Sequence, residues 1–248
     1  MKDVEIIVKG EIHTSKGDLE EERELLLEGV DHLILEGAER EPNLGLFDQW
    51  YAWILMITDY LFARHLYVDK SILTDLADIQ DAEIHSTRES DADVLRNSRT
   101  LVRVVAGVSF LFLATVSLGL GVTGHVAAGA LLLLISALGP LLLLRMHESG
   151  RSETGRDAQM AGLIEDAARE TRVGGRVVAV VGNAHAKQIP KFLSDDLPDP
   201  KVVPPAYGFI SIPHFKELFY PGFVSFSVLY VGYSALLAYV LFIHTHLG

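Results

Sequence analysis

Three long stretches of this chain are almost free of charge. The first contains a single charged residue, Arg103, near its start, and the other two contain none. The three stretches are Leu101–Val122, Ala127–Leu144 and Phe223–Ile243. A helix of about 20 apolar residues is long enough to cross about 30 Å of hydrocarbon. We therefore expect three transmembrane helices, two in a hairpin over residues 101–145 and one C-terminal helix within residues 221–248.

A fourth apolar segment, Trp50–Val68, is interrupted by polar residues. Asp59, Arg64 and His65 would each be costly at membrane depth. The hairpin returns the chain to the side of the membrane on which it started. The polar regions before and after it therefore share one side only if Trp50–Val68 does not cross. We interpret residues 50–68 as an amphipathic helix that packs on the polar domain or lies at the membrane interface.

The polar parts of the chain carry shorter patterns, which predict an α/β domain in two halves. In the first half, residues 1–100, the apolar runs Val4–Val8 and His32–Leu35 are typical of buried strands. A helix lies between them, and Asp18 can cap it in a capping box with Glu21. A strand, a helix and a second strand in succession normally form parallel sheet.

The second half, residues 146–220, repeats this order. Met160 and Ile164 fall on the apolar face of its predicted helix. The predicted elements are helix Thr154–Thr171, strand Val177–Val181, a short helix at Gln188–Leu193 and a loop over Asp195–Pro205. The stretch Asp78–Asp93 indicates a hydrated acidic helix or loop. The expected fold class is α/β, a parallel or mixed sheet with flanking helices, plus about three transmembrane helices.

Composition narrows the classes of function. Hydrophobic residues make up 49% of the chain, yet its formal net charge is −12, because the acidic residues crowd into the polar parts. This acidic balance argues against nucleic acid as the main partner. The absence of cysteine excludes a disulfide framework, a thiolate nucleophile and a zinc site with sulfur ligands.

Positive charges predict an orientation in the membrane. Arginines flank the two outer ends of the hairpin, whereas its turn, Thr123–Val126, has neither lysine nor arginine. These arginines are Arg96, Arg99, Arg103, Arg145, Arg151 and Arg156. The positive-inside rule then places the α/β domain of a multi-pass cell-membrane protein in the cytoplasm. The segment Met1–Glu5 lacks the pattern of a signal peptide, so we expect the folded domain to begin near residue 1.

Each half of the α/β domain carries a Gly-x-x-His turn directly after a predicted strand. Gly10-Glu11-Ile12-His13 follows the first strand, and Gly182-Asn183-Ala184-His185 follows the last. Glycine lets the backbone bend sharply and approach a ligand closely. Open parallel sheets bind ligands beyond the carboxyl ends of their strands. If these two strands are neighbours, both imidazoles therefore reach one crevice.

Two imidazoles and a carboxylate are a suitable set of ligands for a divalent metal ion. Glu36 ends the second predicted strand and is a natural third ligand or general base, while Glu11 is a competing carboxylate. Such a site activates water and polarises a carbonyl, as in metal-assisted hydrolysis. Arg156 could hold a carboxylate or stabilise an oxyanion, and Asp157 could be a favourable charge near a helix N-terminus. Taken singly, each of these residues more often has a structural role.

The order of these residues resembles the TraB/PrgY pheromone-shutdown family. That family belongs to a superfamily with the Tiki metalloproteases, the GumN proteins and, more distantly, the ChaN and erythromycin esterase-like proteins. The resemblance covers roughly half of the chain and rests on Gly10–His13, Glu36, Gly155–Ala161 and Val181–His185. C-terminal membrane helices also occur in relatives of this family. Arg40 lies near the position at which the family often has an arginine after the acidic residue.

The resemblance implies a membrane-anchored, metal-dependent hydrolase that acts on a peptide. His13, His185 and Glu36 would be ligands of a divalent cation, manganese-like or cobalt-like. Arg156 and Asn183 would orient the site while activated water attacks a peptide carbonyl. The expected partners are the lipid bilayer and a peptide or protein that serves as substrate or signal.

Two alternatives stay open at the level of sequence. One is a non-catalytic membrane protein that binds or sequesters a peptide signal. The other, which we favour less, is an esterase-type hydrolase that uses histidine as a base without a metal. In either case the glycines of the hairpin permit close helix packing, and hence a homo-oligomer formed through the membrane helices. These glycines are Gly107, Gly119, Gly121, Gly129 and Gly139.

Overall fold

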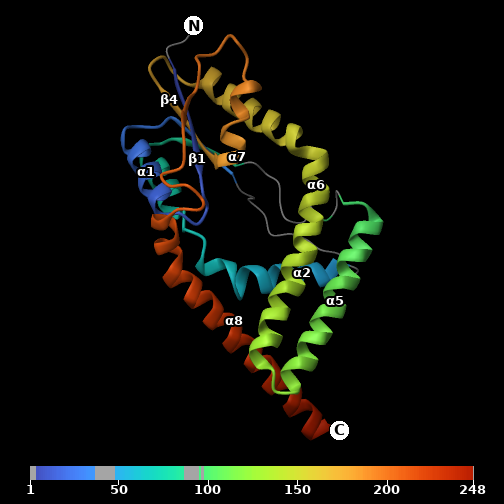
Figure 1. Cartoon of the computed structure of the whole chain (residues 1–248). Helices are drawn as coiled ribbons and strands as arrows, with labels where there is room; N and C mark the ends of the chain where they lie inside the picture. Colours follow the sequence, from blue (N-terminus) through green and yellow to red (C-terminus); the bar gives the residue numbers. More distant parts are fainter. Residues whose placement is uncertain (1–3, 37–47, 87–94, 96–97, 248) are drawn as a thin grey trace. The chain divides into compact units, whose positions relative to one another are not determined.

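The computed structural model describes residues 4–36, 48–86, 95 and 98–247, and Figure 1 shows the course of the chain. The chain divides into two compact units. The sheet unit comprises residues 1–41, 67–90 and 151–218, and the helical unit comprises residues 42–66, 91–150 and 219–248. Each unit is described by itself below.

The sheet unit is built on five parallel strands in the order β3-β2-β4-β1-β5. The strands are β1 (Glu5–Glu11), β2 (His32–Leu35), β3 (Glu83–Ser86), β4 (Arg176–Gly182) and β5 (Lys201–Val203). The two strands with continuous apolar runs, β1 and β4, pair along their full length at the centre of the sheet. This arrangement confirms the predicted α/β class with a parallel sheet.

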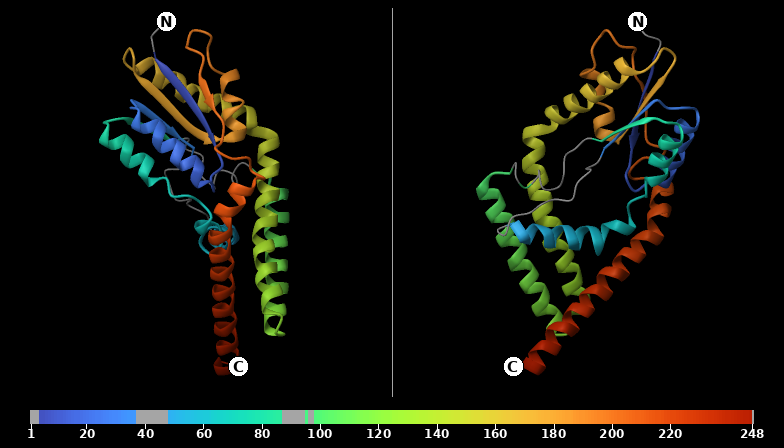
Figure 2. Two further views of the ribbon diagram at one scale, coloured as in Figure 1. Left: turned by 60° about the vertical axis from the view of Figure 1, so that its left-hand side comes forward. Right: turned by 180° about the vertical axis from the view of Figure 1, so that it is seen from behind.

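Helices cover both faces of this sheet, as Figure 2 shows. Successive side chains of a strand point to opposite faces. Ile7 and Val178 accordingly face α1 (Lys16–Leu27) and α3 (Ser71–Ile79), with Leu26, Leu73 and Ala77 in the same core cluster. On the other face the last part of α6 (Val126–Glu170) packs against the sheet, together with α7 (Asn183–Ala186) and η4 (Ile189–Lys191). The predicted apolar face of this part of α6 is confirmed, since Met160, Ile164, Ala167 and Ala168 are all buried there.

Some elements differ from the sequence prediction. Helix α1 is capped by Ser15, whose side chain accepts a hydrogen bond from the backbone N–H of Asp18, so the predicted capping by Asp18 is wrong. Strand β5 lies inside the predicted loop 195–205, and β3 lies inside the stretch 78–93 that was assigned to an acidic helix or loop. Both are edge strands of three or four residues with polar or proline neighbours, and such strands leave no run of apolar residues.

The long apolar helices lie mostly in the helical unit. Helix α5 (Thr100–Val122), the segment Val126–His147 of α6 and the segment Ile212–Ile243 of α8 (Ile212–Leu247) are each long and apolar enough to cross a membrane. The prediction of three such helices is confirmed. The last one begins earlier than expected, because α8 continues through Pro221 instead of starting beside it. Only 17–39% of their apolar windows is buried inside the protein, so most of this apolar surface is exposed.

Glycines in this unit make room for a buried tyrosine. A Cβ atom at Gly121 or Gly129 would overlap the hydroxyl of Tyr233 on α8. That hydroxyl donates a hydrogen bond to the backbone oxygen of Ser117, whose own hydroxyl donates to the oxygen of Gly129 at 2.7 Å. Gly107 faces Trp50 in the same way. These glycines therefore serve packing within the chain, whereas Gly119 and Gly139 have open space at their Cβ positions.

The segment predicted as an amphipathic helix, residues 50–68, is a helix in three pieces. These are α2 (Gln49–Leu55), the π-helical turn η2 (Met56–Tyr60) and the 3-10 turn η3 (Ala63–His65). In Figures 1 and 2 the first two pieces run crosswise to the long apolar helices. Tyr51, Ile54 and Ile57 are buried in the core of the helical unit, while Trp53 and Tyr60 are exposed. Aromatic side chains of this kind suit a membrane interface, and the predicted place of this helix, at the interface or on the polar domain, stays a prediction.

Candidate functional site

The two Gly-x-x-His turns leave the sheet side by side. Strands β1 and β4 are neighbours, with Gly10 opposite Val181 and Glu11 opposite Gly182. After β1 the chain passes over to β2 and β3 on one side, and after β4 it passes to β5 on the other. The carboxyl ends of two such central strands form the crevice where open α/β sheets usually bind ligands. The predicted approach of the two turns is therefore observed.

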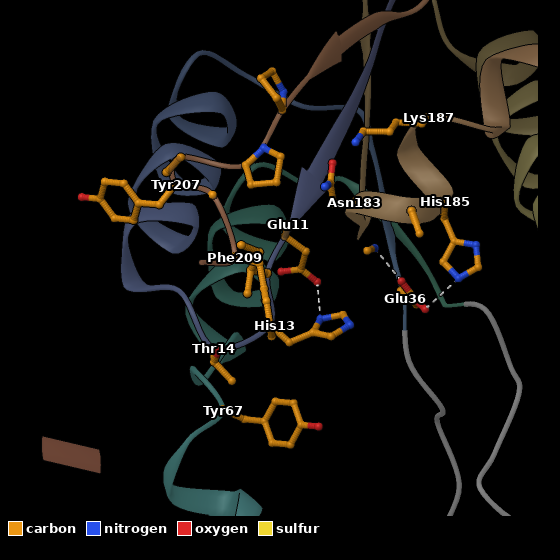
Figure 3. A pocket seen from close by; sticks show the side chains of 17 residues that line it. Glu11, His13, Thr14, Glu36, Tyr67, Asn183, His185, Lys187, Tyr207 and Phe209 are labelled. Carbon is orange, nitrogen blue, oxygen red and sulfur yellow. Dashed lines mark hydrogen bonds and ion pairs between the residues drawn. The ribbon is translucent and has the colours of Figure 1, made fainter. Parts of the chain in front are cut away.

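A pocket of about 730 Å³ opens at this point. It is lined by the ends of β1 and β4, by Glu36 just after β2, by Tyr67, and by the loop that follows β5. Of the residues predicted for the site, the pocket contains Glu11, His13, Glu36, Asn183 and His185 (Figure 3). Its rim carries the aromatic side chains of Tyr67, Tyr207 and Phe209.

Both histidines are held in the same way, by a carboxylate on Nδ1. The Nδ1 atom of His13 lies 2.7 Å from Oε1 of Glu11, and the Nδ1 atom of His185 lies 2.6 Å from Oδ1 of Asp157. Both carboxylates are buried. A carboxylate on Nδ1 fixes the ring and leaves Nε2 as the free ligand atom, which is the usual support of a metal-binding histidine.

Glu36 stands between the two imidazoles. Its Oε2 atom accepts a 2.6 Å hydrogen bond from the backbone N–H of Gly182, and its Oε1 atom lies 3.7 Å from Nε2 of His185. A Cβ atom placed on Gly182 would lie 3.2 Å from Glu36 Oε2, 3.7 Å from His185 Cδ2 and 3.9 Å from His13 Nε2. Three side chains therefore converge on the space above Gly182, where a Cβ atom would be tight against Glu36.

The carboxyl group of Glu11 is held in its charged form. Burial alone would raise the pKa of this carboxyl, but the hydrogen bond from His13 and the charge of Lys70, with which Glu11 also forms an ion pair, lower the pKa to about 2. The hydrogen bond to Glu11 in turn raises the pKa of His13 above its usual value, against the opposing effect of burial. Glu11 is therefore an anion that holds the ring of His13 and the ammonium of Lys70, which suits an orienting role better than that of a general base.

A buried lysine ties the first turn to the loop after β5. The Nζ atom of Lys9 lies 2.9 Å from Asp18 Oδ1 and 2.6 Å from Glu21 Oε2, and it donates to the backbone oxygen of Pro204 at 2.8 Å. Asp18 also accepts hydrogen bonds from the backbone N–H groups of Ile12, at 2.8 Å, and Ala206, at 2.6 Å. This network fixes two walls of the pocket. It also explains why Asp18 is used inside the domain and not as a helix cap.

The buried carboxyl group of Glu22, which lies near Glu11, has a raised pKa that can be tested. Burial and the neighbouring charge of Glu11 raise the pKa of Glu22 to about 8. Because the folded protein then holds a proton that the unfolded chain releases, stability should fall as the pH rises from about 4.5 to about 8. We expect Glu22→Gln to abolish this fall and to raise the free energy of unfolding at pH 8.5 by on the order of 3 kcal/mol.

Denaturation curves across that pH range, followed by circular dichroism in detergent, provide the measurement. The exposed Glu24 on the same helix gives the matched control, Glu24→Gln, which should keep the wild-type pH dependence. An unchanged pH dependence in Glu22→Gln would contradict the raised pKa.

A second group of metal-type ligands lies elsewhere in the sheet unit. His32, Glu83 and His85 each offer a ligand atom, and these atoms all lie within 4.8 Å of one another, so this group could hold a metal ion. It is the tightest such group among the described residues, whereas the ligand atoms above Gly182 stand farther apart. The sequence analysis missed it, although a signal exists. Glu83 and His85 alternate on one strand, and His32 begins the strand beside it.

Arg156 and Arg40 were also named from the sequence. Arg156 is not among the lining residues of the pocket, although it directly precedes Asp157 on α6. Its predicted role at the reacting centre stays a prediction. Arg40 lies outside the described residues.

Comparisons with known proteins give no match from which a role for these site residues could be taken. No protein-family model, curated protein or solved structure is significantly similar to this chain. The structure agrees with the sequence-based expectation in its parallel α/β sheet with flanking helices and in its three long apolar helices.

Proposed function

We propose that this protein is a membrane-anchored, metal-dependent hydrolase that cleaves peptides in the pocket above Gly182. One observation carries the proposal. Two histidines on adjacent parallel strands each have a buried carboxylate on Nδ1, and the carboxylate of Glu36 stands between their rings. Histidines that serve only packing have no need of matched carboxylates and a shared opening.

The residues present fit a divalent cation. Two imidazole nitrogens from His13 and His185 and one oxygen from Glu36 form a mixed nitrogen and oxygen donor set, which suits manganese-like, cobalt-like or zinc-like ions. The 3.7 Å between Glu36 and His185 would need only a small side-chain rotation to reach ligand spacing. When bound, such a cation lowers the pKa of a water molecule and polarises a carbonyl.

The other side chains position the substrate. Glu11 and Asp157 keep the imidazoles oriented, and the short bond from Gly182 to Glu36 fixes one carboxylate oxygen while the other faces the opening. Asn183 also lines the pocket, and its amide can hold a peptide carbonyl. The aromatic rim of Tyr67, Tyr207 and Phe209 offers apolar surface to side chains of a peptide.

The proposal also includes the family of the protein, its orientation in the membrane and its oligomeric state. The order of the site residues supports membership of the TraB/PrgY family. The arginines around the hairpin support an α/β domain on the cytoplasmic side of a multi-pass cell-membrane protein. Gly119 and Gly139 support a homo-oligomer through the membrane helices, because their Cβ positions are open.

The test is peptide cleavage by the full-length protein in lipid nanodiscs. A mixture of peptides is incubated with the protein and Mn²⁺ or Co²⁺, and the products are identified by mass spectrometry. We expect cleavage that depends on the metal and that is lost with a chelator and in His185→Ala. His125, exposed in the turn between α5 and α6, gives the matched control His125→Ala, which should stay active.

The other outcomes separate the alternatives. Peptides that bind to the metal-loaded protein but stay intact would replace the hydrolase with a protein that sequesters a peptide signal. Cleavage that persists in the chelator but requires His185 would support the esterase-type hydrolase that works without a metal. Neither binding nor cleavage of any peptide would overturn the proposed substrate class.

A further inference from the structure

The group His32, Glu83 and His85 lies outside the pocket, since none of its three residues is among the pocket's lining residues. His32 is the first residue of β2 and is paired in register with Glu83, the first residue of β3. The pocket residue Glu36 follows the carboxyl end of the same β2 strand. At about 3.3 Å per strand residue, the residues His32 and Glu36 are about 13 Å apart along the chain. The group is therefore separate from the candidate hydrolase site.

The two imidazoles of this group have the spacing of two ligands of one ion. Nδ1 of His32 lies 3.1 Å from Nε2 of His85, and the rings are stacked with centroids 5.4 Å apart and an angle of 19° between their planes. Two nitrogens bound tetrahedrally at about 2.0–2.1 Å from one cation stand about 3.3 Å apart. The observed separation is slightly shorter and is that of a hydrogen bond, so the rings would have to turn before both nitrogens face one ion.

Glu83 supplies the third donor. Its Oε2 atom lies 3.8 Å from Nδ1 of His32, and its Oε1 atom lies 4.0 Å from Nε2 of His85. The side chain is 61% exposed, whereas that of His32 is 9% exposed. The carboxylate is therefore free to move the short distance to ligand spacing, while His32 is fixed in the sheet. A hydrogen bond between two histidines would account for the 3.1 Å separation alone, but it gives no role to the carboxylate beside both nitrogens.

We propose that His32, Glu83 and His85 form a second metal site, which binds a zinc-like divalent cation and links edge strand β3 to β2. The role of this second metal site is structural and not catalytic. Strand β3 is a four-residue edge strand that pairs only with β2 among the described strands. A cation held by one residue of β2 and two of β3 fastens that edge, and it stabilises the folded state by an amount that grows with the logarithm of the free cation concentration above Kd.

The test uses a protein from which the pocket ligands have been removed. In His13→Ala/His185→Ala, we expect Zn²⁺ to bind with one equivalent and to raise the thermal unfolding midpoint of the full-length protein in detergent. Co²⁺ in its place should give the intense visible absorption bands of a tetrahedral ion. Adding His85→Gln to this protein should remove both the bound equivalent and the thermal shift, whereas adding His65→Gln, at an exposed histidine of η3, should change neither.

Because His32 is buried and its replacement could unfold the sheet, Glu83→Gln is the second variant. It should weaken Zn²⁺ binding and change the Co²⁺ spectrum while the circular dichroism of the metal-free protein stays the same. Failure of His13→Ala/His185→Ala to bind Zn²⁺, or binding that survives His85→Gln, would overturn the proposal. The result does not depend on the hydrolase, since His85→Gln in the otherwise wild-type protein should keep full peptide cleavage.

Discussion

His185→Ala is expected to abolish cation binding in the pocket above Gly182, and Asp157→Asn to weaken it by about 10–100-fold. The first change removes one of three donors and leaves the buried carboxylate of Asp157 without its partner at 2.6 Å. The second keeps the donor atom but exchanges an anionic hydrogen-bond acceptor for an amide. The imidazole of His185 then becomes a weaker ligand and loses its fixed orientation.

Isothermal titration with Mn²⁺ or Co²⁺ measures both effects. The titrations are made in the His85→Gln background, so that binding at the second group does not contribute. Asp166 is exposed on the same helix as Asp157, and Asp166→Asn should bind the cation like the parent protein. Wild-type affinity in Asp157→Asn would show that the hydrogen bond does not position a ligand. A cation retained by His185→Ala would remove His185 from the site.

Lys9→Met is expected to lower the free energy of unfolding by about 3–5 kcal/mol. The ammonium group is fully buried and lies within hydrogen-bond distance of Asp18, Glu21 and the oxygen of Pro204. Its removal leaves the buried charge of Asp18 without a counter-ion, although two backbone N–H groups still donate to that carboxylate. The loop Pro204–Ala206 also loses its hydrogen bond to Lys9 and keeps the one from Ala206 to Asp18.

Chemical denaturation of the full-length protein in detergent gives this free energy. Lys16 is exposed at the start of the same helix that holds Asp18, and Lys16→Met should change stability by no more than about 0.5 kcal/mol. The double variant Lys9→Met/Asp18→Asn should recover part of the loss, because it no longer buries an unpaired charge. A loss below about 1 kcal/mol in Lys9→Met alone would contradict the role given to this network.

The centre of the fold could be predicted from the sequence, and its edges could not. β1, β2, β4 and the apolar face of α6 are buried, so each leaves a run or a periodic set of apolar residues. β3 and β5 lie at the edges of the sheet, where one side of a strand is open to solvent and polar residues or prolines are tolerated. Their pairing depends on the strand beside them, which local sequence does not reveal.

The same division applies to the candidate site. His13, His185 and Glu36 follow three strands, and parallel strands end at one edge of the sheet, so their meeting could be predicted. The carboxylate on His185 could not. Asp157 reaches that ring only because the last part of α6 packs on the sheet in one particular register. Lys70 reaches Glu11 from a segment that carries no recognisable motif.

Anomalous diffraction from crystals of the full-length protein grown with Mn²⁺ or Co²⁺ tests the central claim most directly. The proposed function predicts an ion above Gly182, about 2 Å from Nε2 of both His13 and His185, with an oxygen of Glu36 as a further ligand. An anomalous peak at His32, Glu83 and His85 with none above Gly182, or no peak at either group, would contradict it.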